Sequence, residues 1–176
     1  MNEQLIVLTD RRGQPIGTAP KLESHHSNTP LHLAFSCYVF NEQGKLLVTQ
    51  RALGKKVWPG VWTNSVCGHP APGEEMTQAI KRRLKDELGM TAKDFELVLP
   101  DYRYKTPPFK GIIENEICPV YFAKTTAEPK PNPEEVADYK WLTWAEWVKE
   151  LESDKNNKYS YWAKDQLKQF KNPPYC

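Results

Sequence analysis

Hydrophobic and polar positions form short runs along most of the chain, and turn-forming residues separate the runs. Apolar runs of strand length lie at residues 5–9, 31–40, 45–51, 95–105, 111–123 and 139–142. Runs of β-branched and aromatic residues between such turn residues are typical of β-strands. The polar residues NEQG join the second run to the third, which predicts a β-hairpin.

A helical pattern replaces the strand pattern at Glu74. Apolar side chains then recur every three to four residues, which predicts a helix with one buried face. Gly89 follows the last of them, where a helix C-cap is expected. The apolar stripe consists of Met76, Ala79, Ile80, Leu84 and Leu88.

Two further helices are predicted near the end of the sequence, within residues 143–171. Thr143 and Glu146 have the spacing of a capping box, which marks the start of the first. The proline-rich segment 127–135 predicts an extended surface connection. Strands mixed with helices in this way indicate an α/β or α+β fold.

Length, charge and cysteine content narrow the class of protein. The 176 residues fit one domain over 1–176, and the net charge of +2 is spread without a basic block, which argues against a nucleic-acid partner. The first residues lack a signal-peptide pattern, and no apolar run is long enough to cross a membrane. The four cysteines have no CxxC spacing, so we expect reduced thiols in a cytoplasmic protein. A monomer is favoured, although the sequence does not fix the oligomeric state.

Two glutamates and the histidines are candidates for a metal site. Glu114 and Glu116 alternate on the predicted strand 111–123, so both point to one face. Two carboxylates on a largely apolar strand are costly to bury unless a cation lies between them. The four histidines are His25, His26, His32 and His69. Histidine and carboxylate ligands suit Zn²⁺ or Mn²⁺, although the residues alone do not say which histidines would bind.

The segment 68–90 resembles the Nudix box, a loop-helix-loop motif that binds magnesium diphosphate. Gly68, Glu74 and the run at 82–90 match its spacing. The identities differ within the glutamate cluster of that family, because Arg83 and Asp86 stand at two of its positions and only Glu87 is retained. A guanidinium in this place inverts a charge that the hydrolases of the family use to hold magnesium ions.

Two interpretations of Arg83 remain open at this point. Arg83 and Glu87 are four residues apart, so they could form a surface ion pair on the helix. Alternatively, Arg83 binds phosphate oxygens while Glu87 reaches them through magnesium. The basic residues Arg51, Lys55 and Lys21 would add to the neutralisation of a diphosphate.

Four further stretches extend the resemblance to a family of isomerases. The segments LHLAFS, QRALGKKVWPGVWTNSVCGHP, DYRYK and GIIENEICPV resemble the type I isopentenyl-diphosphate delta-isomerases, over residues 21–162. The resemblance implies a Nudix α/β/α sandwich with a mixed sheet and an N-terminal extension that covers the active site. It also implies the interconversion of isopentenyl and dimethylallyl diphosphate, an allylic and homoallylic pair of small molecules, by protonation and deprotonation.

The resemblance further implies roles for individual residues. The catalytic residues would be Cys67, Glu116 and Tyr104. One divalent ion, Mn²⁺ or Zn²⁺, would be bound by His25, His32, His69, Glu114 and Glu116. The Cys67 carbonyl and the Glu87 side chain would hold Mg²⁺ on the substrate. Substrate would be bound by Lys21, Arg51, Lys55, Arg83 and Trp162.

Two other functions are compatible with parts of the sequence. A Nudix hydrolase of a nucleoside diphosphate derivative would explain the box and the fold, but not Arg83 or Cys67. A zinc-stabilised binding module without catalysis would make the metal structural, with Cys67 as a possible ligand.

Overall fold

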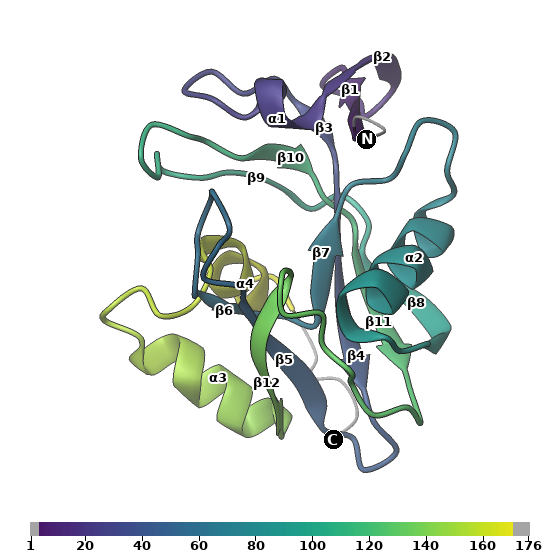
Figure 1. Ribbon diagram of the computed structural model, residues 1–176, viewed down its shortest axis with the longest axis vertical. Coiled ribbons are helices and arrows are strands. Elements are labelled where there is room, and N and C mark those ends of the chain that lie inside the picture. Colours follow the sequence, from purple (N-terminus) through teal and green to yellow (C-terminus); the bar gives the residue numbers. More distant parts are fainter. Residues whose placement is uncertain (1–3, 171–176) are drawn as a thin grey trace.

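A computed structural model describes residues 4–170 as two β-sheets and four helices (Figure 1). The upper sheet has the strand order β2-β1-β3-β10-β9. The central sheet has the order β12-β5-β4-β11-β8, with β6 paired to β5 and β7 paired to β4. The strands are β1 Leu5–Thr9, β2 Pro15–Pro20, β3 His32–Leu33, β4 Phe35–Phe40, β5 Leu46–Arg51, β6 Trp62–Thr63, β7 Val66–Gly68, β8 Lys93–Leu99, β9 Arg103–Lys105, β10 Asn115–Ile117, β11 Val120–Lys124 and β12 Val136–Leu142. The helices are α1 Lys21–Ser24, α2 Met76–Leu88, α3 Trp144–Ser153 and α4 Tyr161–Leu167.

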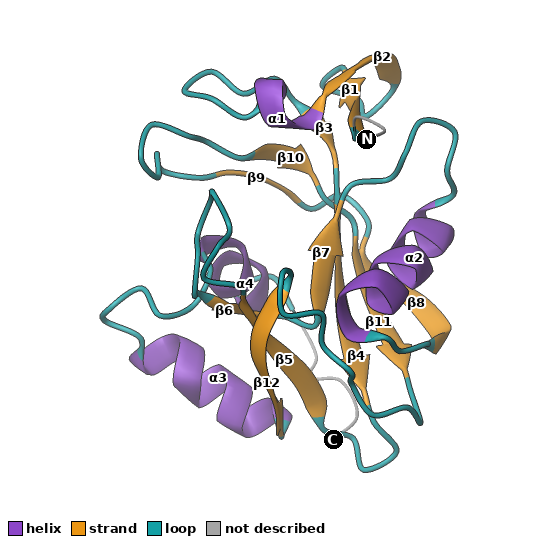
Figure 2. Cartoon of the chain, viewed as in Figure 1, coloured by secondary structure: helices purple, strands orange, loops and turns teal. Residues whose placement is uncertain are grey.

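Helices cover both faces of the central sheet, so the predicted α/β/α sandwich is confirmed (Figure 2). Strand β4 is buried along its whole length and contributes to both cores because its side chains alternate. Phe35, Cys37 and Val39 pack with α2 on one face. Tyr38 and Phe40 pack on the other face with residues of α3 and α4 such as Trp147.

Three predicted strands are each divided between the two sheets, so their prediction as single strands was wrong. Residues 31–40 form β3 and β4, residues 95–105 form β8 and β9, and residues 111–123 form β10 and β11. The first and third run parallel to each other through both sheets, and Pro119, which has no N–H group, lies at the break. The division places β3, β9 and β10 beside the N-terminal strands in the upper sheet.

The predicted helices are confirmed, with shifted ends. Helix α2 begins at Met76, not at Glu74, because Glu75 is its N-cap and has an extended backbone. The Glu74 carboxylate accepts the Ala71 N–H at 2.8 Å and pairs with Arg82 of the helix. Gly89 is the predicted C-cap, with a left-handed φ of 58°. The capping box of Thr143 and Glu146 is present at α3.

The end of α4, the loop before β12 and several short elements differ from the predictions or add to them. Helix α4 ends at Leu167, and the end of the predicted helical range, residue 171, lies outside the described residues. The segment 127–135 is a loop that contacts the end of α2 through the Lys130 N–H and the Leu88 carbonyl, 2.7 Å apart. Strand β2, helix α1 and strands β6 and β7 were not predicted, and β2, with the sequence PIGTAP, is largely exposed and has no run of apolar residues typical of a strand.

Strands β4 and β5 pair only next to their hairpin, at Phe40 and Leu46, and then diverge. Strands β7 and β6 fill the gap between them, because β7 pairs with β4 and β6 with β5. The turn between β6 and β7 is fixed at the point of divergence, where the Ser65 hydroxyl donates to the Leu47 carbonyl at 2.6 Å. This divergence opens the central sheet toward the upper sheet.

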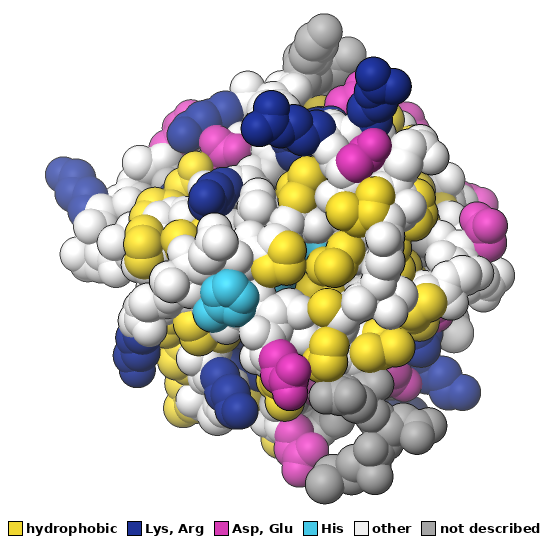
Figure 3. Space-filling view, turned by 90° about the horizontal axis from the view of Figure 1, so that it is seen from above, with side chains coloured by type: hydrophobic (Ala, Val, Ile, Leu, Met, Phe, Trp, Pro, Cys, Tyr) yellow, Lys and Arg dark blue, Asp and Glu magenta, His cyan; other side chains and the backbone are white. Residues whose placement is uncertain are grey.

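None of the helices within residues 4–170 combines the length and apolar character that spanning a lipid bilayer requires. The end of the molecule formed by the upper sheet shows hydrophobic side chains over its centre, with basic side chains around the edges of the view (Figure 3).

Leu84→Ala tests the packing of α2 on the sheet. Leu84 is fully buried in the core that α2 forms with β4. We expect its truncation to lower the free energy of unfolding by about 2–5 kcal/mol, because a cavity remains between helix and sheet. Lys85→Ala, on the exposed side of the same helix, should change it by about 0.5 kcal/mol or less. Urea denaturation of both variants measures the difference, and equal values would contradict the packing described above.

Candidate active site

A cavity of about 440 Å³ lies where the central sheet opens toward the upper sheet. Its lining residues come from α1, β5 and the segment after it, β6, β7, α2, the β9–β10 region, the loop that leads into β12, and α4. Every site residue predicted from the sequence lines this cavity except His32, which is fully buried. His32 instead contacts two lining residues, His69 and Glu116.

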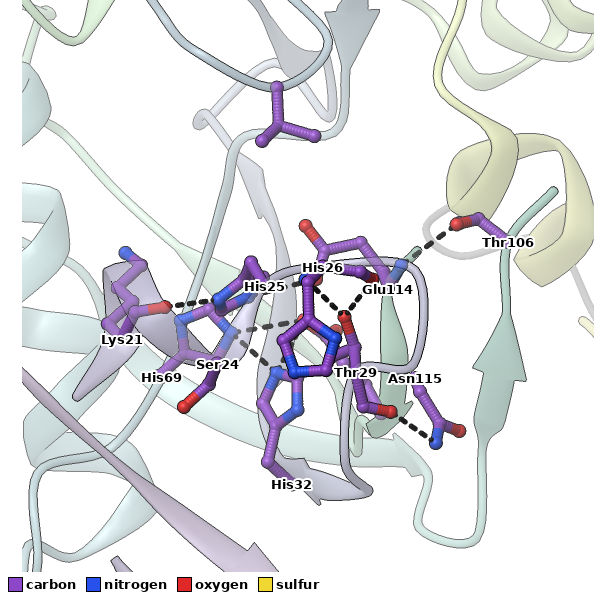
Figure 4. A network of polar contacts seen from close by, with 12 residues as sticks. Lys21, Ser24, His25, His26, Thr29, His32, His69, Thr106, Glu114 and Asn115 are labelled. Carbon is purple, nitrogen blue, oxygen red and sulfur yellow. Dashed lines mark hydrogen bonds and ion pairs between the residues drawn. The ribbon is translucent and has the colours of Figure 1, made fainter. Parts of the chain in front are cut away.

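Three histidines from separate segments converge at one side of the cavity (Figure 4). His25 follows α1, His32 lies in β3, and His69 follows β7. The Nδ1 atom of His25 lies 2.5 Å from the Lys21 carbonyl oxygen, and that of His32 lies 2.8 Å from the Pro30 carbonyl oxygen. A carbonyl can only accept a hydrogen bond, so both Nδ1 atoms carry the proton and both Nε2 atoms present a lone pair to the cluster.

The lone pair of His25 faces a carboxylate oxygen, and that of His32 faces a second imidazole and a carboxylate oxygen. His32 Nε2 lies 3.2 Å from His69 Nε2, and His25 Nε2 lies 3.1 Å from Glu114 Oε2. Glu116 Oε1 lies 3.1 Å from His69 Nε2 and 3.5 Å from His32 Nε2. Lone pairs that point at one another in a buried site are unfavourable unless a cation or a proton lies between them.

The cluster fits a divalent metal ion. One ligand atom from each of His25, His32, His69 and Glu114 lies within 4.8 Å of the others. Burial lowers the pKa of His69 to about 3, so its imidazole is neutral and able to bind a metal at neutral pH. His26 is exposed, and its Nδ1 accepts the Asn28 N–H at 3.0 Å, which places it outside the cluster.

Glu116 is bound on both carboxylate oxygens. Burial alone would raise its pKa, but the contacts of its Oε1 atom with His32 and His69 outweigh burial and hold the pKa well below its ordinary value. On the other oxygen, Oε2, Glu116 accepts the Tyr104 hydroxyl at 2.8 Å. Burial and the adjacent Glu116 raise the pKa of Tyr104 well above its ordinary value, so Tyr104 stays protonated and remains the donor.

Cys67 presents a thiol to the cavity. Burial raises its pKa to about 11, against the opposite effect of hydrogen bonds with Ser36 and Asn64. The Asn64 amide nitrogen donates to the carbonyls of Cys37 and Val66 at 3.0 and 3.1 Å, so its oxygen Oδ1 faces Cys67 Sγ at 3.1 Å.

Sequence analysis missed both partners of Cys67. Ser36 lies in β4, where its hydroxyl is 3.4 Å from Cys67 Sγ. Asn64 is three residues before Cys67, within the segment QRALGKKVWPGVWTNSVCGHP, but no spacing rule marks it out. Cys37, Cys67 and Cys118 are all free thiols, in agreement with the expected reduced state, and Cys176 lies outside the described residues.

Arg83 and Glu87 form a largely buried pair, so the interpretation as a surface helix ion pair was wrong. Their side chains are only 15% and 12% exposed, and Arg83 Nε donates to Glu87 Oε1 at 2.8 Å. Arg83 Nη2 also lies 3.0 Å from Glu135 Oε2, and Lys55 Nζ binds the same oxygen. Glu135 was not predicted, because it lies in the proline-rich loop far along the chain from both cations.

The other predicted cations line the same part of the cavity. Burial, followed by the charges of Arg83, Lys55 and Arg51, lowers the pKa of Lys21 to about 8. Such mutual repulsion among cations indicates a site for a multivalent anion. Arg51 is held by the Trp58 and Val57 carbonyls at 3.1 and 3.0 Å.

Trp162 forms an apolar wall of the cavity. Its Nε1 donates to Thr63 Oγ1 at 2.8 Å, and Trp58 packs edge-on against it at a centroid distance of 5.7 Å. Asp86, in contrast, is exposed on α2 and does not line the cavity. Arg83 and Asp86 stand at the two positions where the chain departs from the Nudix pattern. Of these two, Arg83 places a cation at the cavity, and Asp86 places no carboxylate there.

Comparison with known proteins identifies the fold. Residues 30–163 match the NUDIX domain. A structure from Deinococcus radiodurans aligns with a TM-score of 0.72 and 16% identity over 96% of this chain and 100% of that one. A MutT NUDIX hydrolase from Burkholderia pseudomallei aligns with a TM-score of 0.60 and 18% identity, covering 79% of this chain and 97% of the hydrolase. At these identities the likeness shows the fold alone.

Sequence comparison identifies nearer relatives. A protein of Saccharopolyspora erythraea named isopentenyl-diphosphate Delta-isomerase is 58% identical over 81% of this chain and 73% of that protein. Proteins with the same name from Clavibacter sepedonicus and Klebsiella pneumoniae are 55% and 54% identical, covering 79% and 78% of this chain and 73% and 74% of theirs. The chain therefore belongs to the isopentenyl-diphosphate Delta-isomerase family and has the Nudix fold.

Proposed function

We propose that this protein interconverts isopentenyl diphosphate and dimethylallyl diphosphate, by adding a proton at one end of an allylic unit and removing one at the other. The observation that carries the proposal is the composition of one cavity, where a thiol, a carboxylate bound by tyrosine, an indole ring and a group of cations meet. Family membership supports the same function.

Cys67 and Glu116 are the proposed acid and base. Both line the cavity, and each is held by buried partners that fix the direction of its proton-transferring atom. Because the reaction is an interconversion, the group that protonates one isomer must deprotonate the other in the reverse direction, so both residues exchange protons with substrate. Tyr104 orients the Glu116 carboxylate through its hydroxyl.

Trp162 is proposed to stabilise the positive charge that protonation of an alkene creates. The face of an indole ring attracts a cation and does not attack it. A carbocation would be trapped by water, so the enclosed position of the reacting groups between the two sheets favours isomerisation over addition of water.

The possible metal-binding cluster supports a role for divalent ions. We propose that His25, His32, His69, Glu114 and Glu116 hold one divalent ion, Mn²⁺ or Zn²⁺, and that the Cys67 carbonyl and Glu87 hold Mg²⁺ with the diphosphate. When bound, these ions would supply charge stabilisation at the Glu116 carboxylate and at the phosphate oxygens. Lys21, Arg51, Lys55 and Arg83 are the proposed direct contacts to the diphosphate, which binds substrate at a distance from the reacting carbons. A cytoplasmic location, a single domain over 1–176, a monomeric state and the absence of nucleic-acid or membrane partners stay predictions.

The experiment that tests this function is incubation with isopentenyl diphosphate, Mg²⁺ and Mn²⁺ or Zn²⁺ in heavy water, followed by proton NMR. We expect dimethylallyl diphosphate that contains deuterium, because both steps exchange protons with groups that exchange with solvent. Phosphate release without deuterium incorporation would instead support the Nudix hydrolase. Neither product would support the non-catalytic zinc module.

A further inference from the structure

The Glu135 carboxylate forms ion pairs with two of the cations that we propose to bind diphosphate, Lys55 and Arg83. Its Oε2 atom contacts both Lys55 Nζ and Arg83 Nη2, the latter at 3.0 Å. Burial alone would raise its pKa, but the hydrogen bond from Lys55 and the charge of Arg83 lower it, so Glu135 is a carboxylate at neutral pH. An incoming phosphate must compete with this carboxylate for the same N–H donors.

The position of Glu135 is fixed by the backbone around it. The Asn132 N–H donates to the Glu87 carbonyl at 2.8 Å, and the Glu135 N–H donates to the Asn132 carbonyl at 2.9 Å. The Glu135 carbonyl in turn accepts the Ala52 N–H at 3.0 Å. The loop is thereby attached to the end of α2 on one side and to the segment after β5 on the other, so the carboxylate cannot withdraw far from the cavity.

Arg83 and Lys55 already have carboxylate partners before any ligand binds. Arg83 lies between two carboxylates, Glu87 and Glu135, and Lys55 shares Glu135 with it. A free diphosphate carries several negative charges and would meet both carboxylates at close range. A diphosphate complexed with magnesium carries less charge, and its metal ion can lie next to the carboxylates instead of opposing them.

We propose that Glu135 makes the cavity selective for the magnesium complex of a diphosphate over the free diphosphate, by competing for Lys55 and Arg83. The inference rests on the proposed function, because it concerns how the same site distinguishes two forms of its ligand. Glu135 touches protein cations and acts through them, so it is a residue that sets specificity by charge.

Glu135→Gln tests this selectivity with inorganic diphosphate as the probe. Isothermal titration calorimetry would measure its affinity for the protein in buffer without added magnesium and in excess magnesium. We expect the variant to bind free diphosphate about tenfold more tightly than the wild-type protein does, because one opposing charge is lost. Binding in excess magnesium should change by about threefold or less, so the ratio of the two affinities falls.

Two control variants show whether a change in the ratio of affinities comes from Glu135 itself. They separate it from the loss of any nearby negative charge and from a loss of structure. Glu134 lines the same cavity and forms no ion pair within residues 4–170, so Glu134→Gln should leave the ratio nearly unchanged. Glu135→Asp keeps the charge and should retain most of the wild-type ratio, with thermal unfolding confirming that each variant is folded.

Each other outcome has a definite meaning. Equal weakening of both forms in Glu135→Gln would show that Glu135 only holds Lys55 and Arg83 in place, and would overturn the proposal. An unchanged ratio, or the same change in Glu134→Gln, would also overturn it. Failure of the wild-type protein to bind diphosphate with or without magnesium would instead contradict the proposed function of the site.

Discussion

Replacing Glu116 with glutamine should lower the rate of isomerisation by about a thousandfold, the middle of the range for loss of a general acid or base. Glutamine has the shape of glutamate but can neither accept nor release the proton at neutral pH. Its neutral amide also leaves His32 and His69 without the carboxylate that each contacts, at 3.5 and 3.1 Å. The rate is measured by proton NMR with isopentenyl diphosphate in heavy water.

Tyr104→Phe provides the matched control for this prediction. It removes the 2.8 Å hydrogen bond to Glu116 but keeps the carboxylate and an aromatic ring of nearly the same size. We expect a smaller loss, about tenfold, in line with one hydrogen bond to a charged group. Metal content of both proteins, measured by mass spectrometry, separates loss of the ion from loss of the proton carrier. A Glu116→Gln protein that isomerises at the wild-type rate would rule out the proposed mechanism.

The sequence predicted those parts of the fold whose cause is local. The stripe from Met76 to Leu88 predicted α2 because one face of a helix must be buried, and Gly89 marked its end because its φ is positive. The capping box at Thr143 and Glu146 was equally local. The division of 31–40 into β3 and β4 was not predictable in this way, because the residues on both sides of Ala34 are apolar and only their partners, β10 and β11, lie in different sheets.

The residues of the candidate site also differ in whether a local sequence pattern could predict them. The grouping of Glu114 with Glu116 followed from the period of a strand, whereas the choice of His25 over His26 and the roles of Cys67 and Trp162 came from the resemblance to a family. The structure brings these residues to one cavity, while their roles stay predictions. Ser36 and Glu135 were missed because their partners become neighbours only through tertiary structure: Ser36 and Cys67 are 31 positions apart, and Lys55 and Glu135 are 80 positions apart.

Cys67→Ala should abolish detectable isomerisation while leaving the metal cluster and the fold intact. The thiol is the only proposed proton carrier on its side of the substrate, so its loss should lower the rate by about a thousandfold. Its Sγ atom bonds to Asn64 and Ser36, at 3.1 and 3.4 Å, and the possible metal cluster is formed without it. Metal content should therefore equal that of the wild-type protein.

This pairing of outcomes separates catalysis from a structural role of the thiol. Cys118 is a second buried thiol near the same serine, with Ser36 Oγ and Cys118 Sγ 3.5 Å apart, but it does not line the cavity. Cys118→Ala should retain far more activity than Cys67→Ala, because it removes a thiol that does not line the cavity and that affects the reaction only through its hydrogen bond with Glu116. If Cys67→Ala lost its metal together with its activity, Cys67 would be a metal ligand, as the zinc-stabilised module requires. If it kept both, the proton on that face of the substrate would have to come from another group, and Cys67 would not be catalytic.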